Sequence, residues 1–401
     1  MVRVNGGTLN LAGSANVSST VEVSSGTLAA QSANSLSRLV MRGGTRSGTG
    51  TLTVGSLDWS GGTFTGAGTT TVTGVATLSA LNSPSVDAGH TLRLQGQSTW
   101  VAADSALISS TGGTILNAAG ATFTDAGTLN SGQLRYLGYS TGSFVNEGSF
   151  VRTGLGTTNL YGLANTGLVD VQGGILSLQS ASTVAGQVAV ASGAVLEFGS
   201  GVSSLSATTS GSGVVRIGGG TVTVGSPAVL GSTLELAGGV LDVQTNQSFS
   251  SLVLNGGTLK GAGQSTVTGQ TTLTATGGSN ARIESGHTLT LQGNTLWDAA
   301  NGRINLFGTM ANAAGATVTD TGSGTHYLGN GGTGVFNNAG TYVRSGTGTT
   351  NATGFNNTGL LDVRGGVFTS RGNSTIGGNT TLASSGVLGF IAGTSSITGA
   401  V

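Results

Sequence analysis

Residues 219–259 read GGTVTVGSPAVLGSTLELAGGVLDVQTNQSFSSLVLNGGTL and contain three glycine pairs, at 219–220, 238–239 and 256–257. The pairs recur at steps of about 18–19 residues, and alternating polar and apolar residues follow them. Alternation with period two is typical of β-strands, and glycine readily adopts the positive φ that tight turns need. A repeat this short cannot fold alone, but it fits one coil in a stack of coils.

A longer repeat contains several of these coils. SLDWSGGTFTGAG at 56–68 returns as SLVLNGGTLKGAG at 251–263. Residues 56–190 and 251–385 are copies of one unit, offset by about 192–197 residues. Together the repeats predict an all-β fold in which residues 1–401 form one continuous parallel β-helix (β-solenoid), right-handed, with coils of about 18–20 residues. Because the pattern runs up to both ends, we expect a fragment of a longer chain.

The composition excludes several classes of protein. Charged residues are only 7% of the chain, and 14 acidic residues balance 14 basic ones, so no basic face for a nucleic-acid partner is expected. There is no cysteine, which excludes disulfide bonds and thiolate metal sites. No run of 18 apolar residues occurs, so no transmembrane segment is predicted, and no signal peptide is visible.

Asparagine recurs in a second type of turn, in FVNEG at 144–148, LANTG at 163–167, FNNAG at 336–340 and FNNTG at 355–359. Asparagine tolerates the left-handed conformation of turns, and stacked asparagine side chains can form amide ladders between coils. The alternative is that they are ordinary exposed turn residues. The candidates for a structural ladder are Asn117, Asn146, Asn165, Asn312, Asn338 and Asn357.

The motifs GGTFTGAGTTTVTG, FVNEGSFVRTG and NTGLVDVQGG resemble the strand repeats of very large bacterial surface and secreted proteins. These are autotransporter passengers and filamentous-haemagglutinin-like adhesins, whose repeats form right-handed β-helices. The resemblance covers almost the whole chain. It implies an extracellular or cell-surface location and host or matrix glycans or proteins as partners. A solenoid without caps is also expected to associate end to end, because its edges present unpaired backbone groups.

Polysaccharide lyases and glycoside hydrolases also occur on β-helices, so a catalytic function is an alternative. Such enzymes need carboxylates grouped closely together, whereas the fourteen acids here are spread almost evenly along the chain. GGVLDV and GGTLKG do not keep the aspartate register of calcium-binding nonapeptide repeats. We therefore expect no catalytic residues, no metal site and no cofactor.

Histidine and tryptophan recur at equivalent places in the two copies. His90 and His287 share a strand face with the leucines that follow them, so a structural, inward-facing role is expected. Trp100 and Trp297 also correspond, and a repeated tryptophan either packs in the core or stacks on a sugar ring.

The repeated charges complete a short set of candidates for surface binding. Asp170 recurs as Asp362 and Arg152 as Arg344. Asp170 alternates with valines, which places its side chain outward. The candidates for a binding surface are Trp100, Trp297, Asp170, Asp362, Arg152 and Arg344.

The predicted function is a non-enzymatic stalk or adhesive segment, a surface-display rod of a large bacterial extracellular protein. The alternative is a carbohydrate-binding or carbohydrate-active β-helix. A third hypothesis is ice binding, because threonine runs such as TTTVT at 69–73 resemble the flat threonine arrays of ice-binding β-helices. These runs are scattered, however, and threonine is also a good strand former.

Overall fold

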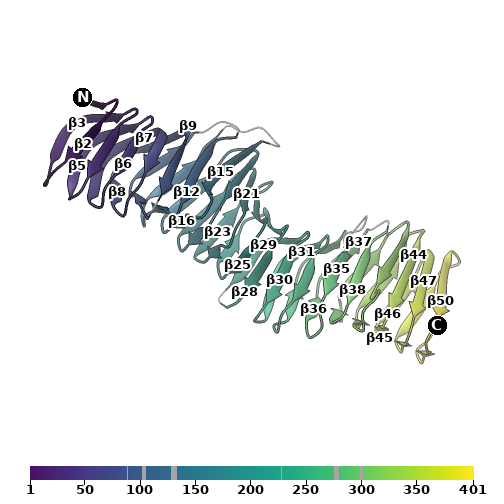
Figure 1. Ribbon diagram of the computed structural model, residues 1–401. Helices are drawn as coiled ribbons and strands as arrows, with labels where there is room; N and C mark the ends of the chain where they lie inside the picture. The colour runs from purple at the N-terminus through teal and green to yellow at the C-terminus, as the bar shows by residue number, and fades with distance from the viewer. Residues whose placement is uncertain (88, 102–104, 128–132, 227, 275–279, 299–300) are drawn as a thin grey trace. The chain divides into compact units, whose positions relative to one another are not determined.

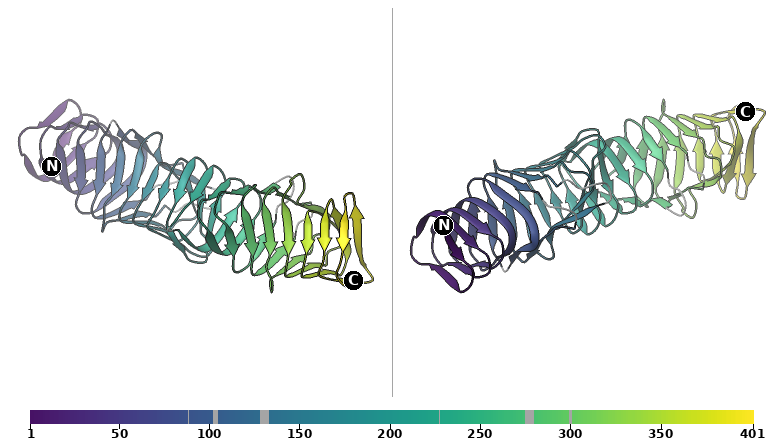
Figure 2. Two further views of the ribbon diagram at one scale, coloured as in Figure 1. Left: turned by 90° about the horizontal axis from the view of Figure 1, so that it is seen from below. Right: turned by 90° about the horizontal axis from the view of Figure 1, so that it is seen from above.

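The computed structural model describes residues 1–401 except 88, 102–104, 128–132, 227, 275–279 and 299–300. The described residues form β-strands and turns, with no helix among them (Figure 1). They divide into two compact units. The N-terminal unit contains Met1–Ser203 and Ala207–Gly213, and the C-terminal unit contains Ser204–Ser206 and Val214–Val401. Within each unit the strands stack coil upon coil (Figure 2), so the predicted β-solenoid fold is confirmed.

A regular coil of the N-terminal unit consists of three short strands joined by turns. Each strand pairs in parallel with its counterparts in the coils before and after it, which creates three ladders, A, B and C. Over three successive coils, ladder A contains β12 (Leu107–Thr111), β15 (Leu134–Tyr139) and β18 (Thr157–Leu160); ladder B contains β13 (Thr114–Asn117), β16 (Ser143–Asn146) and β19 (Leu163–Asn165); ladder C contains β14 (Thr122–Asp125), β17 (Ser149–Arg152) and β20 (Leu168–Val171).

The C-terminal unit repeats this arrangement with the corresponding strands of the second sequence copy. Its pairings are again parallel and in register. Ladder A contains β38 (Arg303–Leu306), β41 (Thr325–Leu328) and β44 (Thr349–Thr353); ladder B contains β39 (Thr309–Asn312), β42 (Val335–Asn338) and β45 (Phe355–Asn357); ladder C contains β40 (Thr317–Asp320), β43 (Thr341–Arg344) and β46 (Leu360–Val363).

The number of residues in a coil varies more than the sequence predicts. Thr221 pairs with Val240, which is the step of one regular coil, but Thr114 pairs with Ser143, a step about half as long again. β13 and β16, on both sides of the long step, have four residues each, whereas β15 between them has six and carries an extra residue in its pairing with β12. A solenoid tolerates such insertions because each coil contacts only its neighbours.

Side chains alternate between the interior and the surface along each strand. Leu92 and Leu94 of β10 (Thr91–Leu94) are fully buried, whereas Arg93 between them is half-buried. Leu289 and Leu291 of β36 (Thr288–Leu291) are buried in the same way. The inward orientation predicted for these leucines from the alternation is thus confirmed. Each buried leucine contributes roughly 2 kcal/mol to stability.

Candidate functional site

A column of buried asparagines occupies the ends of the ladder B strands in the N-terminal unit. Asn117 Nδ2 donates a hydrogen bond of 2.7 Å to Asn146 Oδ1, and Asn146 Nδ2 donates one of 2.7 Å to Asn165 Oδ1. All three side chains are fully buried. The column continues as Leu94 in the coil before and as Val184 in the coil after, so three amides lie between aliphatic side chains.

The C-terminal unit contains an equivalent column of hydrogen-bonded asparagines, and we call each column an asparagine ladder. Asn312 Nδ2 donates to Asn338 Oδ1 over 2.7 Å, and Asn338 Nδ2 donates to Asn357 Oδ1 over 2.6 Å. Asn338 Nδ2 also donates to the carbonyl oxygen of Leu360, at 3.0 Å. All three side chains are fully buried. Each asparagine ladder therefore joins three successive coils. Each of its hydrogen bonds makes a net contribution of about 1 kcal/mol to stability.

Two strands of ladder C in the N-terminal unit, β14 and β17, end at a buried ionic cluster around Asp125. This carboxylate pairs with Arg135 and with Arg152, whose Nε lies 3.5 Å from Asp125 Oδ2. Thr158 Oγ1 donates to Asp125 Oδ2 over 2.6 Å, and the Arg135 guanidinium lies 4.4 Å from the centroid of the Trp100 ring. Burial, with repulsion from Arg152, lowers the pKa of Arg135 to about 9, so it stays cationic at neutral pH.

Asp320 occupies the equivalent place in the C-terminal unit, and its carboxylate contacts four side chains and the backbone N–H of Gly322. His326 Nε2 lies 2.9 Å and Arg344 Nη1 3.3 Å from Asp320 Oδ1, while the hydroxyls of Tyr342 and Thr350 donate to Oδ2 over 2.8 and 2.5 Å. Burial by itself raises the pKa of Asp320, but the hydrogen bond and charge of His326, with Arg344 and Thr350, outweigh it and lower that pKa below its ordinary value.

Four of the residues predicted for a binding surface lie in the interior instead. Trp100, Trp297, Arg152 and Arg344 are each at most 1% exposed, so the prediction is wrong for them. Arg152 comes two residues after the inward-facing Phe150, and strand alternation therefore places its side chain on the same inward face. The sequence contains this signal, but a charged side chain is buried only where partners such as Asp125 are available.

The two repeated histidines are structural, as their shared face with leucine indicates. His90 Nδ1 donates to the carbonyl oxygen of Gly66 at 3.2 Å, and His90 Nε2 accepts from the Thr70 hydroxyl at 3.1 Å. His287 forms the equivalent pair of bonds, to Gly261 O and Ser265 Oγ. Burial, together with the nearby charge of Arg46, lowers the pKa of His90 to about 4, so the ring is neutral at neutral pH.

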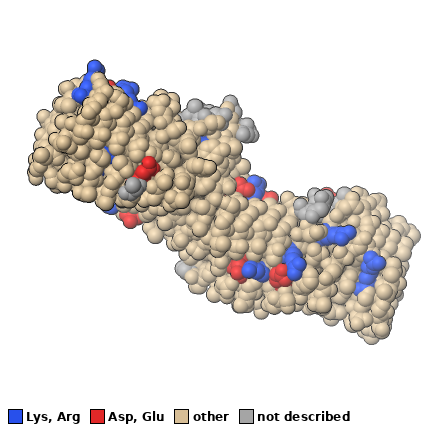
Figure 3. Space-filling view, in the orientation of Figure 1, with Lys and Arg blue, Asp and Glu red and all other residues tan. Residues whose placement is uncertain are grey.

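Outward carboxylates pair mainly with cations. Asp362 accepts from Arg364 Nε at 2.6 Å, and Glu235 accepts from Arg216 Nε at 2.7 Å. Asp170 is half-buried on the outer face and accepts from Gln172 at 2.7 Å. On the face in Figure 3, charged side chains form small groups separated by wide uncharged areas. Among the described residues, no three His, Cys, Asp or Glu side chains lie close enough together to hold a metal ion.

Uncharged features also occur on the surface of the described residues, and two of them are described next. The first is an open groove of about 510 Å³ in the C-terminal unit, lined by Gly269, Gln270, Gln292, Gly293, Asn294 and Gly315. The second is a group of three tyrosines in the N-terminal unit, Tyr136, Tyr139 and Tyr161, whose rings contact one another at the surface. The sequence gives no sign of this group, because its members come from two different coils that the register of ladder A brings together.

Comparison of the chain with protein-family models, with curated proteins and with solved structures finds no match. The assignment to autotransporter passengers or haemagglutinin-like adhesins thus rests on the motifs alone. The structure independently supports the coarser description, a β-helix repeat protein.

Proposed function

We propose that this chain is a non-enzymatic structural or adhesive segment, a stalk or surface-display rod of a large bacterial extracellular or cell-surface protein. The observation that carries the proposal is that polar side chains repeated between the two copies are buried and bond to one another between coils. The ladder asparagines, Asp125 and Asp320 are buried and hydrogen-bonded between coils, where they join neighbouring coils and are out of reach of solutes. The described part of the chain has no helix that would span a membrane.

The main alternative is a carbohydrate-active β-helix, which would need an acid and a base facing one substrate. The outward acids favour the structural role, since several of them pair with cations on neighbouring coils. Asp242 Oδ2, for example, lies 3.4 Å from Lys260 Nζ, and Asp58 pairs with Arg38. Exposed pairs of this kind contribute little to stability, but each sets a carboxylate against a cation instead of against the second carboxyl group that an acid–base pair requires.

Ice binding would require two threonine columns side by side over many coils. Thr51 and Thr53 stack on Thr69 and Thr71 as two such columns, but Arg93 takes the second position in the next coil. Another column consists of Thr8, Thr27, Thr45 and Thr63, which stack in register. In the first of these coils the position two residues further along is Asn10, and the next coils have Ala29 and Ser47 there. The second column is therefore missing over these coils, which argues against a regular array.

The test is a panel of polysaccharides scored for the release of reducing ends. We expect no product above that of the heat-unfolded protein. If product is released, and if one substitution such as Glu197→Gln or Asp170→Asn abolishes its release while the fold is retained, the proposal fails and the carbohydrate-active alternative takes its place.

A further inference from the structure

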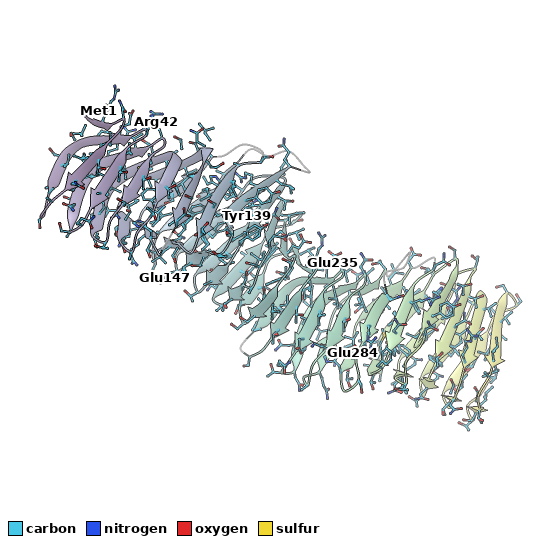
Figure 4. All side chains as sticks on the ribbon, in the orientation of Figure 1. Met1, Arg42, Tyr139, Glu147, Glu235 and Glu284 are labelled. Carbon is cyan, nitrogen blue, oxygen red and sulfur yellow. The ribbon has the colours of Figure 1, made fainter. Side chains whose placement is uncertain are left out.

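The three tyrosines form a defined surface, which we call the tyrosine platform. Tyr136 and Tyr139 belong to β15, and Tyr161 follows β18 in the next coil, where its N–H donates to Leu137 O at 3.0 Å. The ring of Tyr139 meets the other two edge-on, at centroid distances of 6.0 Å to Tyr136 and 5.2 Å to Tyr161. Tyr139 is 47% exposed and lies at the border of the ribbon in Figure 4.

A β-bulge aims Tyr139 outward. In the pairing of β12 with β15, Ile108 is opposite Leu137 but Ser109 is opposite Tyr139, so Gly138 is an extra residue. Gly138 has a φ of +71°, a conformation that glycine adopts readily. Bulges commonly redirect a side chain in this way, and here the bulge puts Tyr139 on the same outer face as Tyr136.

Polar groups adjoin the platform in the following coils. Gln179 lies one coil beyond Tyr161, while Ser177 and Glu197 lie two and three coils beyond Tyr136 in ladder A. Gln179 Nε2 donates to Ser177 Oγ at 2.7 Å, and Ser177 Oγ donates to Glu197 Oε2 at 3.2 Å. These bonds hold the amide one coil beyond Tyr161 and the carboxylate two coils beyond it.

We infer that the tyrosine platform binds an uncharged polysaccharide chain. Exposed aromatic faces offer large apolar contact to the C–H faces of sugar rings, and phenol, amide and carboxylate groups can bond to sugar hydroxyls. The inference rests on the adhesive form of the proposed function and names its ligand class. Tyrosine also suits binding because it loses little conformational entropy on contact.

Other ligand classes fit the platform less well. Glu197 would repel an anionic glycan, and a nucleic acid would need cations that these side chains do not supply. A peptide could not add as a strand, because β15 already pairs with β12 on one side and with β18 on the other. An uncharged chain of sugar rings is the ligand that uses both the exposed rings and the neutral hydrogen-bonding groups.

The C-terminal unit supplies a natural comparison. The sequence Arg-Tyr-Leu-Gly at 135–138 returns as His-Tyr-Leu-Gly at 326–329, but the next residue is Asn330 where the first copy has Tyr139. Thr353 stands where the first copy has Tyr161. The remaining ring, Tyr327, carries the Arg303 guanidinium 4.8 Å from its centroid. Asn and Thr are therefore compatible with this fold at the two positions.

The experiment uses the polypeptide of residues 1–401. An array of uncharged glucans, mannans, galactans and N-acetylglucosamine oligomers, with polygalacturonate as an anionic probe, is followed by calorimetry on each glycan that binds. We expect at least one uncharged glycan to bind and the anionic probe not to bind. The double variant Tyr139→Asn with Tyr161→Thr should bind at least about tenfold more weakly, because it removes two of the three rings and puts the residues of the second copy in their places. The matched control, Tyr327→Asn, should bind like the parent chain.

Three outcomes would overturn the inference: no uncharged glycan binds, the double variant binds as well as the parent, or only a peptide or an anionic glycan depends on the tyrosines. Each of these leaves the structural role untouched, since that role fails only if turnover is found. Binding that needs the tyrosines and releases no product supports both statements.

Discussion

At the scale of single residues, the asparagine ladders offer the sharpest test of what joins the coils. We expect Asn338→Ala to destabilise its coil by about 2–3 kcal/mol, because Asn312 then loses an acceptor and Asn357 a donor inside the protein. Native-state hydrogen exchange of the amides in ladder B measures this effect locally, which suits a repeat array that need not unfold in one step.

Asn337 is the matched control, since it neighbours Asn338 in the same strand but is exposed. It accepts only one surface hydrogen bond, of 3.1 Å, from Asn356. Asn337→Ala should therefore change the local stability by less than about 0.5 kcal/mol. Equal effects at the two positions would show that the ladder does not stabilise the stack.

The buried carboxylate of Asp320 leads to a larger expected effect. Asp320→Asn removes the negative charge that balances Arg344, and it leaves this guanidinium uncompensated in the interior. Loss of one partner from a buried ionic group costs about 3–5 kcal/mol. Asp362→Asn, which affects the exposed pair with Arg364, should cost less than about 1 kcal/mol. Chemical denaturation of both variants measures the two costs. Similar unfolding midpoints would show that the buried Asp320 cluster stabilises the fold no more than the exposed pair does.

Acid should destabilise the coils that contain His90. Its pKa is about 4 when folded and about 6.5 when unfolded, so the unfolded chain binds more protons between these values and stability falls as the pH drops through them. The full loss is about 3 kcal/mol. His90→Gln should remove this part of the pH dependence, measured as the urea midpoint between pH 7 and pH 4. If the variant loses stability in acid as the parent chain does, protonation of His90 is not the cause of that loss.

The residue-scale results also show how far the sequence predicts the site. Facing follows from alternation, so Leu92, His90 and Asp170 lie where the pattern puts them. Alternation equally places Arg152 inward, but charge suggests the surface, and only the structure shows that Asp125 compensates it. Partners of this kind come from different coils, and their sequence separation gives no sign of the contact.

At the scale of turns and strands, the glycine pairs show how closely the coils stack. Gly44 has a φ of +66°, and a Cβ there would collide with the carbonyl oxygen of Gly26 in the preceding coil. Gly7 holds the same turn position with a φ of +67°, but nothing lies within 4 Å of its would-be Cβ. Gly7→Ala should thus cost about 1 kcal/mol from backbone strain alone.

Gly44→Ala adds a steric clash to the same strain, so we expect a total cost of about 2–4 kcal/mol. Thermal unfolding of the two variants compares these costs directly. If both variants unfold at the same temperature, the close approach of successive turns does not limit the sequence here. The double-glycine motif would then reflect backbone conformation alone.

Strand positions were predictable from the sequence because the short strands keep their period-two pattern in every regular coil. The lengths of the turns were not predictable, since a ladder fixes only which residues pair. The long step from Thr114 to Ser143 includes the part of the chain that leads into β15. The tyrosine platform depends on the same strand and on its bulge, so the feature most relevant to binding lies where the repeat is least regular.

At the scale of the whole molecule, the coil formed by residues 386–397 carries four exposed apolar side chains. β50 (Gly386–Ile391) pairs with β47 (Gly366–Arg371), and β51 (Ser395–Ile397) pairs with β48 (Ser374–Ile376). Val387, Phe390, Ile391 and Ile397 are 45–52% exposed. Exposed strand edges with apolar side chains favour pairing with another chain.

We therefore expect a polypeptide of residues 1–401 to associate through this coil, in line with the end-to-end contacts predicted from the repeats. Phe390→Lys places a charge at the edge and should weaken association at least about fivefold in sedimentation experiments, because edge charges oppose strand pairing. Leu81→Lys is the matched control, since Leu81 is 74% exposed in the N-terminal unit, far along the chain from this coil. If the parent chain stays monomeric, or if both lysine variants weaken association equally, the final coil is not the contact surface.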